Sequence, residues 1–99
     1  VNDLVDGIVK LFESRLFVGA VNLTTEEEIS ALDMAQRIKT LTGSNSKIVY
    51  IPQRPGQTSR ESISAAKAKK AFGWSAETAF QSGLEKTYKW LKKIPRKDL

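Results

Sequence analysis

The stretch KIVYIPQRPGQTSRE (residues 47–61) is the part of the sequence on which the predicted fold depends most. A strand pattern changes there into a loop pattern. Residues 47–51 are rich in β-branched and aromatic side chains, and Pro52 closes the run, so we predict a short strand. Residues 52–61 contain two prolines and one glycine, which predicts a loop. A connection of this kind, between a strand and a helix, is a common place for functional side chains.

Apolar residues recur at helical spacing in several segments on either side of this loop. Ser30 has capping-box spacing to Asp33, and Ser64 is placed to cap the segment that follows the loop. Gly43 and Gly73 stand where helices typically stop. The predicted helices are residues 2–14, 30–43, 64–72 and about 79–93. In the last helix we expect an inward face of Phe80, Leu84, Thr87, Tyr88 and Leu91.

A second short strand is predicted for residues 20–23, which present one apolar face. The element order is therefore helix, strand, helix, strand, loop, helix, helix. This order describes a small α/β layer of the α+β-like kind, with four helices and two or three short strands. The length of 99 residues fits a single domain over residues 1–99.

The composition excludes several classes of site. The sequence contains no cysteine and no histidine, so disulfide scaffolds, thiolate metal sites and Ser/His/Asp or Cys/His catalytic sets are excluded, and we expect no metal. The glycines are widely separated and form no Gly-x-Gly-x-x-Gly or Walker loop. We therefore expect this chain alone to be catalytically incomplete.

Charge and hydropathy indicate the surroundings of the protein. The net charge is +5, and the basic residues gather in the last helix, where cations favour the negative end of the helix dipole. We therefore expect no nucleic-acid partner. No apolar run approaches the ~20 residues of a membrane span, so we expect no membrane partner and a cytoplasmic location.

The chain begins at Val1, and its one methionine is Met34, inside a predicted helix. We interpret this as the mark of a fragment of a larger protein.

The loop 51–61 carries two arginines, Arg54 and Arg60, whose guanidinium groups suit phosphate oxygens if the loop folds back on itself. Gly56 would let backbone amides approach an anion closely. The residues by themselves leave open a second interpretation, a solvated turn with incidental charges.

Tyr88 and Lys92 have the Tyr-x-x-x-Lys spacing of a proton-transfer pair. Tyr88, however, lies on the apolar face of the last predicted helix, and such spacing occurs readily in a lysine-rich helix. We interpret the pair as structural.

Five segments, taken in order along the chain, resemble motifs of one enzyme family. The segment VNDLV (1–5) resembles the V-x-D-L-V motif near the substrate site, and Val21-Asn22-Leu23 resembles the family's N-L-G stretch. RPGQ (54–57) resembles the R-P-G-D loop. Residues 65–74 resemble the S-K-A…L-G-W segment, and residues 83–90 resemble G-L-x-x-T-x-x-W. In this order the five segments resemble the extended short-chain dehydrogenase/reductase family, the NAD-dependent nucleotide-sugar epimerases, dehydratases and decarboxylases.

The resemblance implies substrate-binding roles for four residues. Arg54 is implied to grip the diphosphate of a nucleotide sugar, with Arg60 as a second arginine of the site. Gln57 replaces the family aspartate that contacts the ribose, and an amide can still donate and accept hydrogen bonds. Asp3 belongs to the motif near the substrate.

The family's NAD loop and catalytic Tyr-Lys pair belong to an N-terminal Rossmann region that does not match any part of this sequence. The resemblance thus implies that NAD is bound by that other half, which would be this chain's partner, and it allows a homodimer of the intact enzyme. The implied function is the nucleotide-sugar-binding portion of a UDP-glucose 4-epimerase-like enzyme. A dTDP-glucose dehydratase, a UDP-glucuronate decarboxylase and a stand-alone basic interaction module are the alternatives.

Overall fold

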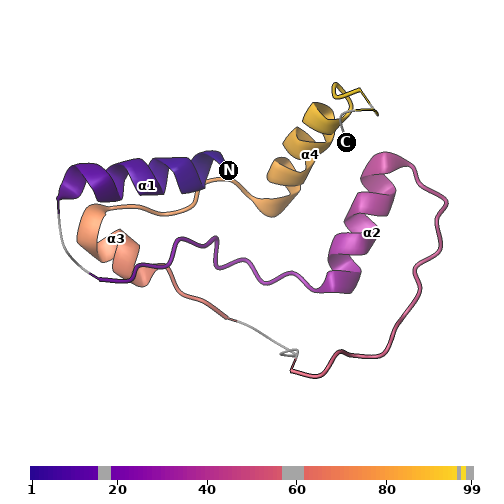
Figure 1. The fold of residues 1–99 in the computed structure, drawn as a ribbon, viewed down its shortest axis with the longest axis horizontal. Coiled ribbons are helices and arrows are strands. Elements are labelled where there is room, and N and C mark those ends of the chain that lie inside the picture. Colours follow the sequence, from indigo (N-terminus) through magenta and orange to yellow (C-terminus); the bar gives the residue numbers. More distant parts are fainter. Residues whose placement is uncertain (16–18, 57–61, 96, 98–99) are drawn as a thin grey trace. The chain divides into compact units, whose positions relative to one another are not determined.

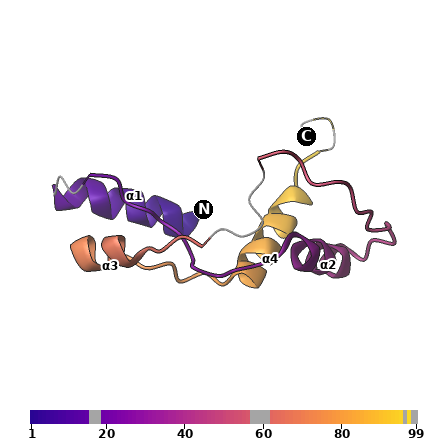
Figure 2. The ribbon, with the colours of Figure 1, turned by 90° about the horizontal axis from the view of Figure 1, so that it is seen from below.

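The computed structural model describes residues 1–15, 19–56, 62–95 and 97, and this part of the chain contains helices but no strand. It divides into two compact units: unit 1 comprises Val1–Glu27 and Arg60–Thr78, and unit 2 comprises Glu28–Ser59 and Ala79–Leu99. Unit 1 holds α1 beside α3, and unit 2 holds α2 beside α4 (Figures 1 and 2). The helices are α1 (Asn2–Ser14), α2 (Ala31–Thr42), α3 (Ala66–Phe72) and α4 (Phe80–Leu91).

Unit 1 is organised around Trp74, whose side chain is only 2% exposed. Ala65 and Ala68 are also buried against it. Their small side chains let α3 approach the indole closely, while partly buried apolar residues surround the cluster. These surrounding residues are Val21, Leu23, Phe72 and Ala76.

The buried Gly7 is the point where α1 meets this cluster. A Cβ atom at Gly7 would lie 2.9 Å from both Leu23 Cδ1 and Trp74 Nε1. Trp74 Nε1 also donates a hydrogen bond of 2.9 Å to the carbonyl oxygen of Asp3, one turn earlier on α1. The close approach therefore satisfies the buried indole N–H as well as packing its ring.

Unit 2 contains the helix pair α2 and α4. Ser30 is the N-cap of α2, and its hydroxyl accepts a 3.0 Å hydrogen bond from the Asp33 amide. Gly43 ends the helix in the left-handed conformation, with φ +67°. Arg37 pairs with Asp33 at 3.0 Å, and its guanidinium lies 5.9 Å from the centroid of the Phe80 ring on α4.

The predicted helices are confirmed, with differences at their ends. Gly43 and Gly73 are the C-caps, as expected. Ser64 is not the N-cap of α3: Ala65 takes that position, and the Ser64 hydroxyl accepts from the Ala66 amide instead. The last helix stops at Leu91, two residues earlier than expected.

The prediction of which α4 residues face inward was wrong in part. Thr87 and Leu91 are exposed. The Thr87 hydroxyl donates to the Gly83 carbonyl one turn back, which satisfies the hydroxyl without burial. Leu84 and Tyr88 are half-buried, as expected.

The expected strands at residues 20–23 and 47–51 are not found, so the described chain shows the helices of the predicted layer without its sheet. A strand needs a second backbone to take up its amide and carbonyl groups, and neither segment has such a ladder in the described residues. The side chains of Val49, Tyr50 and Ile51 are all more than 70% exposed. Strand propensity alone does not supply the missing partner.

None of the described helices has both the length and the apolar character needed to cross a lipid bilayer.

Candidate functional site

The arginine loop is the first candidate, and the structure describes it up to Gly56. Arg54 is exposed, and Pro55 and Gly56 form a turn in which Gly56 has a φ of +78°. Among the described residues other than its chain neighbours, no atom lies within 4 Å of the position that a Gly56 Cβ would occupy. Gln57 and Arg60 lie outside the described residues. The convergence of the two arginines therefore stays a prediction.

Asp3, the second candidate, has a carboxylate that accepts three hydrogen bonds inside unit 1. Its Oδ2 accepts hydrogen bonds from the amides of Glu77 (3.0 Å) and Thr78 (2.8 Å), and its Oδ1 accepts one from the Thr78 hydroxyl (2.9 Å). The Thr78 amide, then the Thr78 hydroxyl, lower the pKa of Asp3 because they stabilise the charged form, with the Glu77 amide adding to the effect. Asp3 thus ties the first turn of α1 to the residues just before α4.

Glu26 plays a similar part, which the sequence did not reveal. Its Oε1 accepts hydrogen bonds from the Ala65 amide (2.7 Å) and the Ser64 hydroxyl (3.0 Å). The Ala65 amide is the main reason that the pKa of Glu26 is lowered; the Ser64 hydroxyl and the nearby charge of Lys69 act in the same direction. Glu26 also has a φ of +57°, which is uncommon for a residue with a side chain. In the sequence it is one of three consecutive glutamates, with nothing to set it apart.

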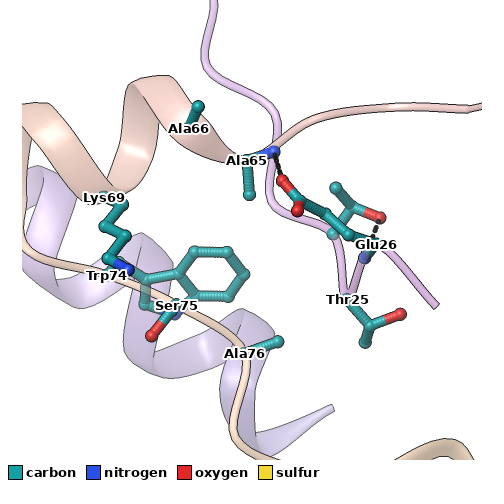
Figure 3. A pocket seen from close by; sticks show the side chains of 9 residues that line it. Thr25, Glu26, Ala65, Ala66, Lys69, Trp74, Ser75 and Ala76 are labelled. Atoms are coloured by element: carbon teal, nitrogen blue, oxygen red, sulfur yellow. Dashed lines mark hydrogen bonds between the residues drawn. The ribbon is translucent and has the colours of Figure 1, made fainter.

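An open pocket of about 230 Å³ lies where Glu26 meets α3 (Figure 3). Glu26 and Lys69 place opposite charges on its lining, and the nearly buried Trp74 lies beneath them. Neither Arg54 nor Asp3 lines this pocket. The full lining is Thr24, Thr25, Glu26, Ala65, Ala66, Lys69, Trp74, Ser75 and Ala76.

The Tyr88 and Lys92 pair makes a stacking contact. The Lys92 ammonium lies 5.4 Å from the centroid of the Tyr88 ring, a cation–π geometry. Tyr88 is half-buried on α4. This geometry supports the structural interpretation of the pair.

The described residues contain no group of three or more potential acidic or nitrogen ligands that could hold a metal ion. The sequence has no histidine or cysteine to act as a base or nucleophile. The polar groups that this part of the chain offers to a ligand are an exposed arginine, Arg54, and a pocket with a carboxylate, an ammonium and hydroxyl groups.

The chain is similar to several curated proteins over nearly its whole length. It is 37% identical over 90 residues to UDP-glucuronic acid decarboxylase 1 of Danio rerio, covering 91% of this chain and 21% of that protein. It is 35% identical over 98 residues to a probable UDP-arabinose 4-epimerase 3 of Arabidopsis thaliana (96% and 24%). It is 32% identical over 97 residues to UDP-glucose 4-epimerase 4 of Oryza sativa subsp. japonica (94% and 26%).

The chain thus spans between 21% and 26% of the length of these three relatives. No protein-family profile matches it, and no solved structure does.

Proposed function

Since the chain belongs to the extended short-chain dehydrogenase/reductase family of nucleotide-sugar enzymes, we propose that it is the nucleotide-sugar-binding portion of such an enzyme. The observation that carries this proposal is the sequence similarity over more than nine tenths of the chain. The names of the relatives share one ligand class, a sugar attached to a nucleoside diphosphate. The chain would bind that ligand and leave the chemical step to the part of the enzyme that holds the cofactor.

Arg54 is the proposed diphosphate ligand. Arg54 is exposed, and a bidentate arginine–phosphate contact is stronger than a neutral hydrogen bond. Arg60 is proposed as a second ligand of the phosphates, and Gln57 as the ligand of the ribose. Asp3 is proposed to support the site indirectly, because its three internal hydrogen bonds already occupy its carboxylate.

For the reaction of the whole enzyme we propose 4-epimerisation of a UDP-sugar. Relatives named UDP-sugar 4-epimerases support this choice, although others are named UDP-glucuronic acid decarboxylase and GDP-L-fucose synthase. Decarboxylation of a UDP-sugar acid and dehydration of a dTDP-sugar are the alternatives within the family. Holding the nucleotide contributes to any of these reactions, because a fixed remote group orients the reacting sugar.

The described residues do not form a glycine-rich loop that could hold the diphosphate of NAD. The glycines with positive φ do not share a phosphate-binding loop: Gly43 and Gly73 end helices, and Gly19 and Gly56 lie in separate loops. We therefore assign NAD to a Rossmann region outside this chain, as in the family. Since cysteine is absent, we place the protein in the cytoplasm, where thiol cross-links are rare.

The partner that we propose is this Rossmann region of the same enzyme. The face of α1 turned away from Trp74 carries Val5, Ile8, Val9 and Phe12, whose side chains are between 46% and 84% exposed. An apolar face of this kind is typical of an interaction surface. Co-expression of the chain with the Rossmann region of a relative should yield a stable complex, and Ile8→Asp should prevent its formation.

Isothermal titration calorimetry with UDP-glucose tests the binding role. Arg54→Ala should weaken binding at least about tenfold, since hydrogen bonds between charged groups contribute about 1.5–3 kcal/mol. Lys47→Ala, which removes an exposed charge from the same unit, should leave the affinity nearly unchanged. Equal affinity of Arg54→Ala and the unaltered protein would remove Arg54 from the site. Failure of UDP-glucose, UDP-glucuronate and dTDP-glucose to bind at millimolar concentration would refute the proposed function.

The second candidate function is a basic interaction module that acts without nucleotide sugars. The exposed lysines of α4 are the observation that favours it.

A further inference from the structure

One side of α4 presents three lysines and a tryptophan to solvent. Lys86, Lys89 and Trp90 lie on α4, and Lys93 follows in the hydrogen-bonded turn after it. Residues spaced by three, four and seven positions share one face of a helix. We call these four residues the basic stripe.

Two features set the basic stripe apart from ordinary solvated surface. The Trp90 side chain is 60% exposed, although an indole is among the largest apolar groups in proteins. In the described part of the chain, no carboxylate forms an ion pair with the three lysines. The only acid on α4, Glu85, accepts a hydrogen bond from Gln81 instead. The helix dipole accounts for a lysine in the last turn, but it does not account for an exposed tryptophan.

The opposite face of α4 packs inside unit 2. Phe80 contacts Arg37 of α2, and Leu84 and Tyr88 are half-buried. The helix therefore cannot turn an apolar face into a lipid bilayer without leaving α2. The stripe also offers a single aromatic ring, whereas single-stranded nucleic acid is held by several stacking side chains along a groove.

We propose that the basic stripe binds an acidic amphipathic helix of a protein partner. A helix with carboxylates at the same three- and four-residue spacing would meet the lysines, and an apolar side chain between them would cover Trp90. Tryptophan is enriched among the residues that dominate binding energy, and complementary charge speeds and orients the encounter. This inference is independent of the nucleotide-sugar proposal.

The test uses fluorescence anisotropy with the full chain and a labelled 15-residue helical peptide that carries Glu at every third or fourth position and Leu between. We expect saturable binding that weakens at least about tenfold between 50 and 500 mM NaCl, because salt screens such charges. Lys89→Glu/Lys93→Glu should weaken binding at least about tenfold, and Trp90→Ser about fivefold or more. The neutral pair Lys89→Gln/Lys93→Gln should show an intermediate loss.

The matched control is Lys47→Glu/Lys70→Glu, which changes net charge by the same amount at exposed lysines elsewhere. This control should weaken binding less than about threefold, because neither lysine lies on α4 and only the net charge changes. An equal loss in the control and the stripe variant would overturn the proposal in favour of bulk charge. Tighter binding of a dT15 oligonucleotide, or of phosphatidylserine vesicles, would overturn the choice of partner. UDP-glucose should not compete with the peptide, so the two proposals can fail separately.

Discussion

Replacing either tryptophan with phenylalanine makes the same chemical change in two opposite environments. Trp74 is 2% exposed and donates a 2.9 Å hydrogen bond to the Asp3 carbonyl, whereas Trp90 is 60% exposed. The lost hydrogen bond costs about 1 kcal/mol. The space left by the smaller ring, enclosed by Ala65 and Ala68, costs a further 1–2 kcal/mol or so. We therefore expect Trp74→Phe to destabilise unit 1 by about 2–3 kcal/mol and Trp90→Phe to cost less than about 0.5 kcal/mol.

Urea unfolding followed by far-UV circular dichroism measures both changes. With a denaturant slope of about 1 kcal/mol per molar, Trp74→Phe should lower the midpoint of the unit 1 transition by about 2–3 M. Amide hydrogen exchange then locates the effect, because protection should fall on α1 and α3 and stay unchanged on α2 and α4. Equal shifts for the two variants, or a loss of protection confined to unit 2, would refute the central packing role of Trp74.

Three further changes test the local contacts. The pKa values of Asp3 and Glu26 are lowered from 3.8 and 4.5. Unit 1 should therefore keep its stability at neutral pH and lose it as acid protonates both carboxylates below about pH 4. Asp3→Asn/Glu26→Gln should flatten this pH dependence of the stability in urea titrations at several pH values. Gly7→Ala gains about 1 kcal/mol of helix propensity but forces a Cβ to 2.9 Å from the Trp74 ring. We therefore expect thermal melts to show a net loss of stability of up to about 2 kcal/mol. A stabilised variant would contradict the packing of Gly7 against Trp74. Ser30→Ala removes the acceptor for the Asp33 amide and should lower stability by about 1 kcal/mol in urea melts, whereas Ser62→Ala, at an exposed position outside the helices, should have little effect.

The helices were predictable because their signals are local. The apolar spacing of residues 4–12, the Ser30 cap and the stop at Gly43 each act within one or two turns. Ser64 shows the limit of such signals. A serine has the right chemistry for an N-cap, yet the helix starts only after Ala65. The reason is Glu26, which lies 38 positions earlier in the chain and accepts hydrogen bonds from the Ser64 hydroxyl and the Ala65 amide.

The candidate site was predictable in part and for a different reason. The RPGQ loop was identified by its resemblance to a family, and the comparisons find relatives named as UDP-sugar epimerases and a UDP-sugar acid decarboxylase, in agreement with that resemblance. The structure shows Arg54 exposed, but it does not describe Gln57 or Arg60. Asp3 was identified by its motif, whereas its partners Glu77 and Thr78 could not be, because contacts across more than seventy residues have no periodic signal.

Local spacing, composition and ordered motifs were enough to predict the four helices, to exclude cysteine and histidine chemistry, and to reveal the resemblance to a family. Only the tertiary structure decided what Asp3, Glu26 and Gly7 do. Each is an ordinary helix or loop residue in the sequence, and each acquires its role from a backbone or an indole that folding brings to within 3 Å or so. The two strand-like segments show the same point in reverse. Their residue types give them strand propensity, but a strand forms only where a second backbone pairs with the segment.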